Sequence, residues 1–344
     1  MSFNRRAALA LGFGGVAAAG LAAASRLFAA EPGLPPGDGP ITVEATPIPA
    51  LLPSEPDRTQ FGGLTFRSGL VLSSRSPEFG GWSGLWRSAD GSEIVAVSDR
   101  AEWLTARVLA QDGRTSGLTD AAVAPILGEN GTALRRGNGW DSECLAIAGG
   151  EAFVGFERVQ EIRRYAWAQN GVPARGFPLP VPPAVKRLSS NEGLEALAIV
   201  PEGRPLAGRL VTIAERARAG DDQPTAGWVL GGEPFEFDVV RSEGFDITDL
   251  AFLPSGEALL LERRCRLLTG VACRIRRLGA DAFRPGALVD GEVIFEADRK
   301  YEIDNMEGMA LHLDPASGRQ ILTLISDDNF SAAQRTILLE FSLG

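Results

Sequence analysis

Glu143-Cys144-Leu145-Ala146-Ile147 is the clearest copy of a short pattern that recurs along this 344-residue chain, in which an acidic or hydroxyl residue opens an apolar run. The other copies, the first of them weaker, are Ser83-Gly84-Leu85-Trp86-Arg87, Glu195-Ala196-Leu197-Ala198-Ile199, Thr248-Asp249-Leu250-Ala251-Phe252 and Glu307-Gly308-Met309-Ala310-Leu311. Successive first residues are 60, 52, 53 and 59 positions apart. Recurrence at this interval indicates a fold built from structural repeats.

Each copy is followed by a turn and by a second β-rich run that ends in an acid. The turns are rich in glycine, proline, aspartate and serine, as hairpin connections are. The second runs are Ile94 to Asp99, Ala152 to Glu157, Leu210 to Glu215, Ala258 to Glu262 and Ile321 to Asp327. A hairpin of short apolar strands cannot cover both of its faces, so its repetition predicts radially packed sheets. We therefore expect an all-β protein that forms a single β-propeller.

The number of blades follows from how the remaining strand-like segments are used. Third-strand candidates at 161–167, 273–278 and 336–341 bring each unit towards four strands. Five units follow Ser83, and residues 61–73 would either start a sixth blade or complete the last one. We expect six four-stranded blades, with five as the alternative. An irregular β-sandwich is the rival fold, and the paired spacing of the acids disfavours it.

The first 60 residues differ in composition from the repeats. Arg5 and Arg6 precede a stretch of alanine, leucine, glycine and valine, which is typical of a twin-arginine export signal over 1–30. A Sec signal or a retained anchor is the alternative. Residues 31–60 form a Pro-rich leader, and 61–344 form the propeller domain. We expect a periplasmic or secreted monomer with no membrane segment after signal cleavage.

The charge balance limits the classes of partner. The chain has 34 basic and 44 acidic side chains and a net charge of −10, which disfavours binding of nucleic acid or of an anionic membrane. Cations are favoured as small partners.

The acids of each repeat are expected to gather at one place. In an antiparallel hairpin the start of the first strand lies beside the end of the second. Glu143 thus lies beside Glu157, Glu195 beside Glu215, Glu307 beside Asp327, and Asp249 beside Glu262. Because the innermost strands of a propeller run parallel around its tunnel, these acids should all meet at one tunnel mouth.

So many carboxylates in one mouth must be protonated, paired with arginine or bound to a cation. Calcium fits best because it takes six to eight oxygen ligands; magnesium is less favoured, and a single histidine disfavours zinc. The expected metal ligands are Glu143, Glu195, Glu307, Asp327, Asp328 and Asn305.

Four of the second runs place an arginine directly after the acid, namely Arg100, Arg158, Arg216 and Arg263. One interpretation is that each acid pairs with the next arginine in a structural salt bridge. Adjacent strand residues point to opposite faces, which weakens that interpretation within one blade. The alternative is that these arginines bind substrate.

Two stretches near the C-terminus resemble the phytase-like, esterase-like family of bacterial exported proteins. They are Asp304-Asn305-Met306-Glu307-Gly308-Met309-Ala310 and Ile325-Ser326-Asp327-Asp328-Asn329-Phe330, followed by Gln334-Arg335-Thr336. Trp140-Asp141-Ser142-Glu143 and Asn191-Glu192-Gly193-Leu194-Glu195 are similar to the family's acid-then-glycine motif, with Cys144 and Ala196 where glycine is common. The resemblance covers residue 61 to the end. It implies a propeller distantly similar to β-propeller phytases, which bind phosphate esters through calcium.

Other residue patterns favour structural roles over catalytic ones. His312 is the only histidine and lies in a strand-like run, which favours a structural role over a catalytic one; no nucleophile-elbow motif is present. Cys265 and Cys273 either form a disulfide across a hairpin loop or remain thiols. The arginine-rich stretch from Arg263 to Arg277 alternates with apolar residues and indicates solvated strand faces.

Three functions remain open. The first is an exported, calcium-assisted hydrolase of a phosphate ester, with Glu157, Glu215 or Asp99 as the base. The second is a calcium-dependent lactonase or arylesterase, which fewer basic groups near the metal would favour. The third is a non-catalytic propeller that binds a ligand or a protein.

Overall fold

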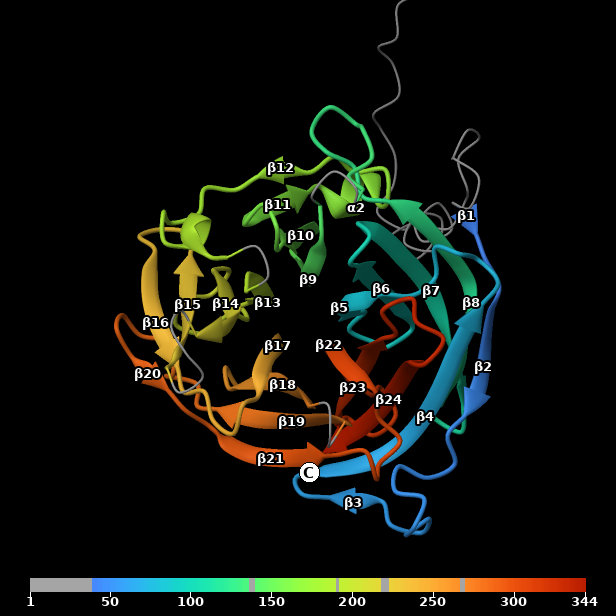
Figure 1. Cartoon of the computed structure of the whole chain (residues 1–344). Helices are drawn as coiled ribbons and strands as arrows, with labels where there is room; N and C mark the ends of the chain where they lie inside the picture. Colours follow the sequence, from blue (N-terminus) through green and yellow to red (C-terminus); the bar gives the residue numbers. More distant parts are fainter. Residues whose placement is uncertain (1–38, 136–139, 190–191, 218–222, 267–269) are drawn as a thin grey trace, which may run out of the picture.

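The computed structural model describes residues 39–135, 140–189, 192–217, 223–266 and 270–344. These residues form five sheets arranged radially around a central axis, and the innermost strands of the sheets surround that axis (Figure 1). The chain is therefore a β-propeller, as the repeats predicted. It has five blades, which is the alternative count and not the six that we favoured.

Blades 1 and 2 follow each other along the chain. From the axis outward, blade 1 contains β5 (Trp82–Arg87), β6 (Glu93–Ser98), β7 (Glu102–Gln111), β8 (Arg114–Pro125) and β1 (Gly39–Pro40). Blade 2 contains β9 (Ser142–Ala148), β10 (Glu151–Phe156), β11 (Glu161–Tyr165) and β12 (Phe177–Pro178). The short helix α2 (Trp167–Asn170) lies between β11 and β12, and the 3-10 turn η2 (Val185–Arg187) lies between β12 and the first strand of blade 3.

Blades 3 and 4 share a connection at their outer edges. Blade 3 contains β13 (Leu194–Ile199), β14 (Leu210–Ala217), β15 (Thr225–Leu230), β16 (Phe235–Val239) and β20 (Leu288–Val289). Blade 4 contains β17 (Asp246–Phe252), β18 (Ala258–Arg266), β19 (Gly270–Leu278) and β21 (Glu292–Ala297). The segment between β19 and β21 thus reaches blade 3, where β20 pairs in parallel with β16.

Blade 5 closes the ring with strands from both parts of the chain. It contains β22 (Asn305–Leu313), β23 (Gln320–Asp327), β24 (Thr336–Leu343), β4 (Leu64–Ser74) and β2 (Val43–Pro47), while β3 (Gln60–Phe61) pairs with β4. The antiparallel register of β4 with β24 runs from Leu72 opposite Thr336 to Leu64 opposite Leu343. The segment at 61–73 therefore completes the last blade, which explains why there is no sixth.

The described part of the expected leader, residues 39–60, contributes strands to the sheets. β1 extends the outer edge of blade 1, and β2 extends that of blade 5, so this segment spans the junction where the ring closes. The expected export signal over 1–30 lies outside the described residues. Within the described residues, no helix is long and apolar enough to cross a membrane.

The hydrophobic core consists of five clusters, each of which joins two neighbouring blades. Between blades 1 and 2, for example, Val95 and Trp103 pack with Val154 and Tyr165. Apolar residues on both faces of each blade make these contacts, so the blades are fixed relative to one another. The inner strand ends, where the acids lie, are therefore held in place.

All three cysteines are free thiols. In the β18–β19 hairpin Cys265 lies opposite Val271, and Cys273 lies opposite Arg263, so the two cysteines are not cross-strand partners. Cys265 is exposed, whereas Cys144 and Cys273 are buried. Of the two states that the sequence left open, the structure has the unpaired one.

Candidate functional site

Every innermost strand carries a β-bulge at the same position. The pairing register with the second strand shifts by one residue in all five blades. The residues left unpaired are Ser83, Glu143, Glu195, Thr248 and Glu307, and all five are buried. These are also the first residues of the sequence repeats. Bulges redirect side chains and are frequent beside active sites, so the repeat encodes a ring of redirected side chains.

A second ring lies beside the first, at the end of each second strand. The register pairs the residue before each bulge with Ser98, Phe156, Ala214, Glu262 and Ser326, in blade order. The next residues along the chain are therefore structurally equivalent: Asp99, Glu157, Glu215, Arg263 and Asp327. Four blades place an acid at this position, and blade 4 places an arginine there.

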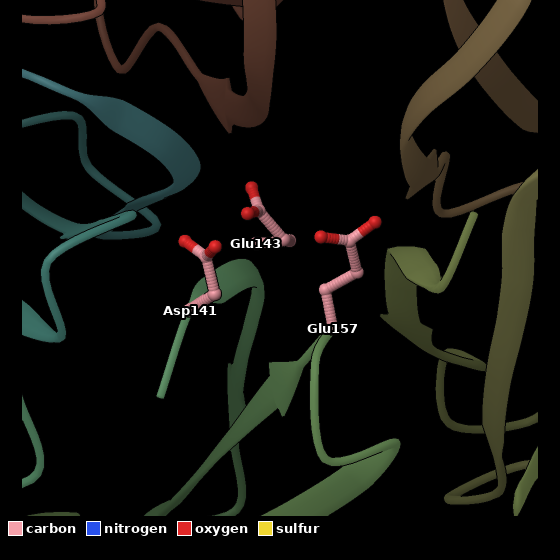
Figure 2. Close-up of side chains that lie close together, drawn as sticks. All are labelled: Asp141, Glu143 and Glu157. Atoms are coloured by element: carbon pink, nitrogen blue, oxygen red, sulfur yellow. The ribbon is translucent and has the colours of Figure 1, made fainter. Parts of the chain in front are cut away.

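The acids of blades 2 and 3 lie close enough together to share a cation. Carboxylate oxygens of Asp141, Glu143 and Glu157 lie within 4.8 Å of one another, and these three side chains point toward one another (Figure 2). Glu157 also lies within the same limit of Glu195 and Glu215. Glu157 thus belongs to both groups, which confirms that the mouth gathers acids from more than one blade.

Glycine at position 193 makes room for Glu157. A Cβ atom on Gly193 would lie 2.4 Å from Cγ of Glu157, and the Gly193 N–H donates to Oε1 of Glu157 over 3.3 Å. Gly308, which follows the bulged Glu307, has a similar close contact, since its Cβ would lie 3.0 Å from that of Leu85. Glycine after the acid therefore lets the inner strands of blades 5 and 1 approach closely.

Burial and mutual repulsion raise the pKa values of these carboxyl groups. Burial, followed by the charges of Glu195, Asp141 and Glu307, raises the pKa of Glu143 well above its ordinary value. Burial and Glu215 do the same to the pKa of Glu195, against the opposing effect of Arg263.

The pKa values of two acids of the second ring, Glu157 and Asp327, are also raised. Burial raises the pKa of Glu157 to about 7, although the Gly193 N–H opposes the shift. Burial and the charge of Glu307 raise the pKa of Asp327 to about 8. Carboxyl groups on blades 2, 3 and 5 therefore act as one electrostatic cluster.

Glu143 and Glu195 have no partner for their carboxylates among the residues that the structure describes. Their exposed fractions are 9% and 5%, and neither accepts a hydrogen bond nor forms an ion pair within the described part of the chain. A buried carboxylate without a partner is costly, so such groups are normally paired or bind a metal. This is the observation that most directly favours a cation-binding role for these two acids.

The expected ligands on blade 5 have protein partners. The Asn305 side chain donates to Oε1 of Glu307 over 2.8 Å, and the backbone N–H of Asn329 donates to Oδ1 of Asp327 over 2.6 Å. Asp328 accepts hydrogen bonds from the N–H groups of Gly81 and Phe330 and from the Thr336 hydroxyl. Asp328 thus connects the blade 5 loop to blade 1.

The four arginines that were expected to bind substrate occupy different surroundings. Arg263 lies among the acids and donates to Asn305, Glu307 and Glu215. Arg100 stacks on the Phe330 ring, with 3.2 Å from its guanidinium carbon to the ring centroid, and donates to the carbonyl of Pro77.

The other two arginines lie at the rim. Arg158 pairs with Asp141 at 2.6 Å, and its side chain is 41% exposed. Arg216 lies 3.5 Å from Glu215 and 3.3 Å from Asp246, and its side chain is 47% exposed. Pairing between an acid and the next arginine therefore occurs in blade 3.

The expectation that Glu262 lies in the mouth was wrong. Glu262 directly precedes the ring position, so its side chain points to the other face of β18, where it binds the buried Arg274 and Arg276 at 2.6 and 2.7 Å. The expectation that the arginine-rich stretch marks solvated faces was wrong for these two arginines, which are each 2% exposed.

Asp249 also has a structural role. Its carboxylate accepts hydrogen bonds from the N–H groups of Leu250 and Met309, at 2.8 and 2.6 Å. It follows the bulge, at the position that other blades fill with glycine, cysteine or alanine, and it connects β17 to β22.

Asp141 was missing from the expected ligands. It precedes β9 and so carries no strand signal, although it lies in the quoted motif with Glu143.

His312 lies at the opposite end of β22 from the mouth. It pairs with Ile321 near the hairpin turn, whereas Asn305 pairs with Asp327 at the acidic end. Burial, followed by the charge of Arg87, lowers the pKa of His312 to about 4. Its place in the strand agrees with the structural role that the sequence favoured.

The fold and site together define a class: five-bladed propellers with buried acids at one mouth of the tunnel. The family model described as phytase-like, esterase-like activity of phytase matches residues 77–330, so the chain belongs to this family. No curated protein matches the sequence.

Similar solved structures are distant. They include the nidogen/laminin complex (10% identity, 77% of this chain and 87% of that chain, TM-score 0.40) and a PQQ-bound aldose sugar dehydrogenase from Streptomyces coelicolor (14%, 87% and 98%, 0.37). The WD40 domain of Toxoplasma gondii coronin is also similar (9%, 88% and 87%, 0.40). At these scores the likenesses carry no argument about function.

Proposed function

We propose that the protein is an exported hydrolase that cleaves a phosphate ester with the help of a calcium ion held at the mouth. The observation that carries the proposal is the pair Glu143 and Glu195, which are buried beside further acids and have no partner in the described part of the chain. An all-oxygen ligand set suits calcium, and magnesium is the less favoured ion. The single histidine lies at the far end of β22, which disfavours zinc.

The two acidic groups supply the ligands of the proposed site. Asp141, Glu143, Glu157 and Glu195 offer carboxylate oxygens from blades 2 and 3, and Glu157 belongs to both groups. A bound calcium ion would supply positive charge that polarises the ester and stabilises the transition state. Glu307, Asp327 and Asn305, which were also expected as ligands, lie on the blade 5 side of the cluster and already have partners.

The remaining groups suggest how the chain would handle substrate and water. Glu215 lies at the edge of one acidic group and contacts both Arg216 and Arg263. We assign it as the base that takes a proton from water, ahead of Glu157 and Asp99, because it lies beside cations that can hold an anionic substrate. The exposed Arg158 and Arg216 retain unused N–H donors for a phosphate group.

A substrate panel tests this function. The purified protein should hydrolyse p-nitrophenyl phosphate with added calcium and lose that activity in a chelator. Glu215→Gln should lower kcat by about 100-fold or more, the usual contribution of a general base. Asp290→Asn removes an exposed acid that pairs with Arg276, so it is the matched control and should retain activity. Failure to cleave any ester would contradict the proposal.

A second candidate is a calcium-dependent lactonase or arylesterase. It is favoured by the ion pairs of Arg158, Arg216 and Arg263, each of which already neutralises an acid. Turnover of a lactone or p-nitrophenyl acetate, with no turnover of the phosphate ester, would select it. Calcium binding without turnover of any ester would select the non-catalytic ligand-binding propeller.

Export is part of the proposal because of the sequence at Arg5 and Arg6. Changing both arginines to lysine should leave the precursor in the cytoplasm. Unchanged processing and export would contradict twin-arginine transport and leave a Sec signal.

A further inference from the structure

The second ring of the mouth has one exception to its acidic pattern. The register places Asp99, Glu157, Glu215 and Asp327 at equivalent positions in four blades, and it places Arg263 there in blade 4. An arginine at this position directs its side chain into the space that the other blades fill with carboxylates. Arg263 is therefore a cation at a ligand position.

The contacts of Arg263 show what that cation does. Its Nη1 lies 2.5 Å from Oε1 of Glu307 and 2.8 Å from Oδ1 of Asn305, while its Nη2 lies 3.3 Å from Oε1 of Glu215. These partners belong to blades 3 and 5, on either side of blade 4. One guanidinium thus connects oxygen atoms from both neighbouring blades, as a metal ion would.

The charges in the mouth agree with this arrangement. Burial opposes the positive charge of Arg263, but Glu307, Glu195 and Glu215 raise its pKa above the ordinary value. Glu143 and Glu195 have neither a hydrogen bond nor an ion pair among the described residues, although the charge of Arg263 also acts on Glu195. The arginine therefore pairs directly with acids of blades 3 and 5, whereas no direct contact links it to Glu143 or Glu195.

We propose that Arg263 is a resident cation that takes the place of a second metal ion. The wild-type mouth then holds one divalent ion, bound by Glu143, Glu157, Glu195 and Asp141. Arg263 blocks a second site, whose oxygens come from Glu215, Glu307, Asp327 and Asn305. This inference rests on the proposed metal site and adds its stoichiometry and the residue that sets it.

Titration calorimetry of the chelated full chain with calcium tests the inference. The wild type should bind one ion, and Arg263→Gln should bind two. Arg216→Gln is the matched control, because Arg216 also contacts Glu215 but lies at the rim, and it should still bind one ion. Arg263→Lys keeps the charge and should also bind one ion.

Each result has a defined meaning. No calcium binding by the wild type would overturn the proposed metal site itself. Two ions bound by the wild type, or one ion bound by Arg263→Gln, would overturn the role of Arg263 and leave the first site intact. Arg263→Gln should fold in calcium even if it does not fold in chelator, because calcium replaces the missing charge. Failure to fold in both would overturn the role of Arg263.

Discussion

Two buried regions of this propeller differ in whether their carboxylates accept hydrogen bonds from protein groups. Between blades 3 and 4, Glu262 is fully buried and accepts four N–H donations from Arg274 and Arg276, at 2.6 to 3.2 Å. In the mouth, Glu143 and Glu195 are nearly as buried and accept none from the described residues. The described residues thus satisfy one buried glutamate completely and provide no partner for two others.

The difference shows which cluster is structural. Arg274 also donates to Ser242, and Arg276 donates to Val240 and Asp290, so the Glu262 cluster is a closed hydrogen-bonding network. A closed network has no position left for a ligand, whereas an incomplete one is costly unless a ligand completes it. Substitutions in the two regions should therefore differ in their effects on stability.

Glu262→Gln should destabilise the protein by about 3–5 kcal/mol, because it leaves two buried arginines without their carboxylate. Urea unfolding followed by circular dichroism would measure the loss, which should be the same in calcium and in chelator. Asp290→Asn is the control, since its exposed pair with Arg276 should contribute at most about 1 kcal/mol. A loss below about 1 kcal/mol for Glu262→Gln would contradict the structural role of the Glu262 cluster.

His312 provides a buried group that is kept neutral. Its pKa of about 4 in the folded state lies below the ordinary value of 6.5, so the unfolded chain binds the proton more readily. Stability should therefore fall as the pH drops from about 6.5 to about 4, by roughly 1 kcal/mol for each pH unit. His312→Asn should lose this part of the pH dependence. Parallel stability curves for wild type and variant across that range would contradict the shifted pKa.

Glu143→Gln should raise the free energy of unfolding in chelator, whereas Glu262→Gln should lower it. In chelator at pH 8 we expect a gain of about 1 kcal/mol, because burial and neighbouring acids make ionisation of Glu143 costlier in the folded state than in the unfolded chain, and glutamine does not ionise. The same urea unfolding experiment measures it. A loss of stability in chelator would mean that the Glu143 carboxylate is already satisfied without a metal.

The number of reactive cysteine thiols should differ between native and denatured protein. Native protein should show one reactive thiol, Cys265, because it is the exposed cysteine, and denatured, unreduced protein should show three. Only one reactive thiol after denaturation would indicate a disulfide instead.

The sequence predicted the repeats and the acids at the mouth because both have a local signal. The first residue of every repeat proved to be the bulged residue of an innermost strand, and hairpin geometry placed it beside the end of the second strand. The blade count needed long-range information. Residues 64–74 pair with the last strand of the chain, and the composition of this segment does not reveal its partner.

The sequence could not predict the face on which each charged side chain lies. Glu262 and Arg263 are adjacent, and a register difference of one residue decides which of them enters the mouth. Asp249 was likewise assigned to the mouth from its place after Thr248, although its partner is an N–H group on blade 5. Such partners arise only when separate blades come together.

If Glu143 and Glu195 hold a calcium ion at the mouth, the unfolding free energy should depend on the concentration of free calcium. At 100 times its dissociation constant, calcium should add about 2.7 kcal/mol to the wild type, and a chelator should reverse the gain. The double variant Glu143→Gln, Glu195→Gln should show no gain. Equal unfolding free energies of the wild type in chelator and in millimolar calcium would contradict the claim.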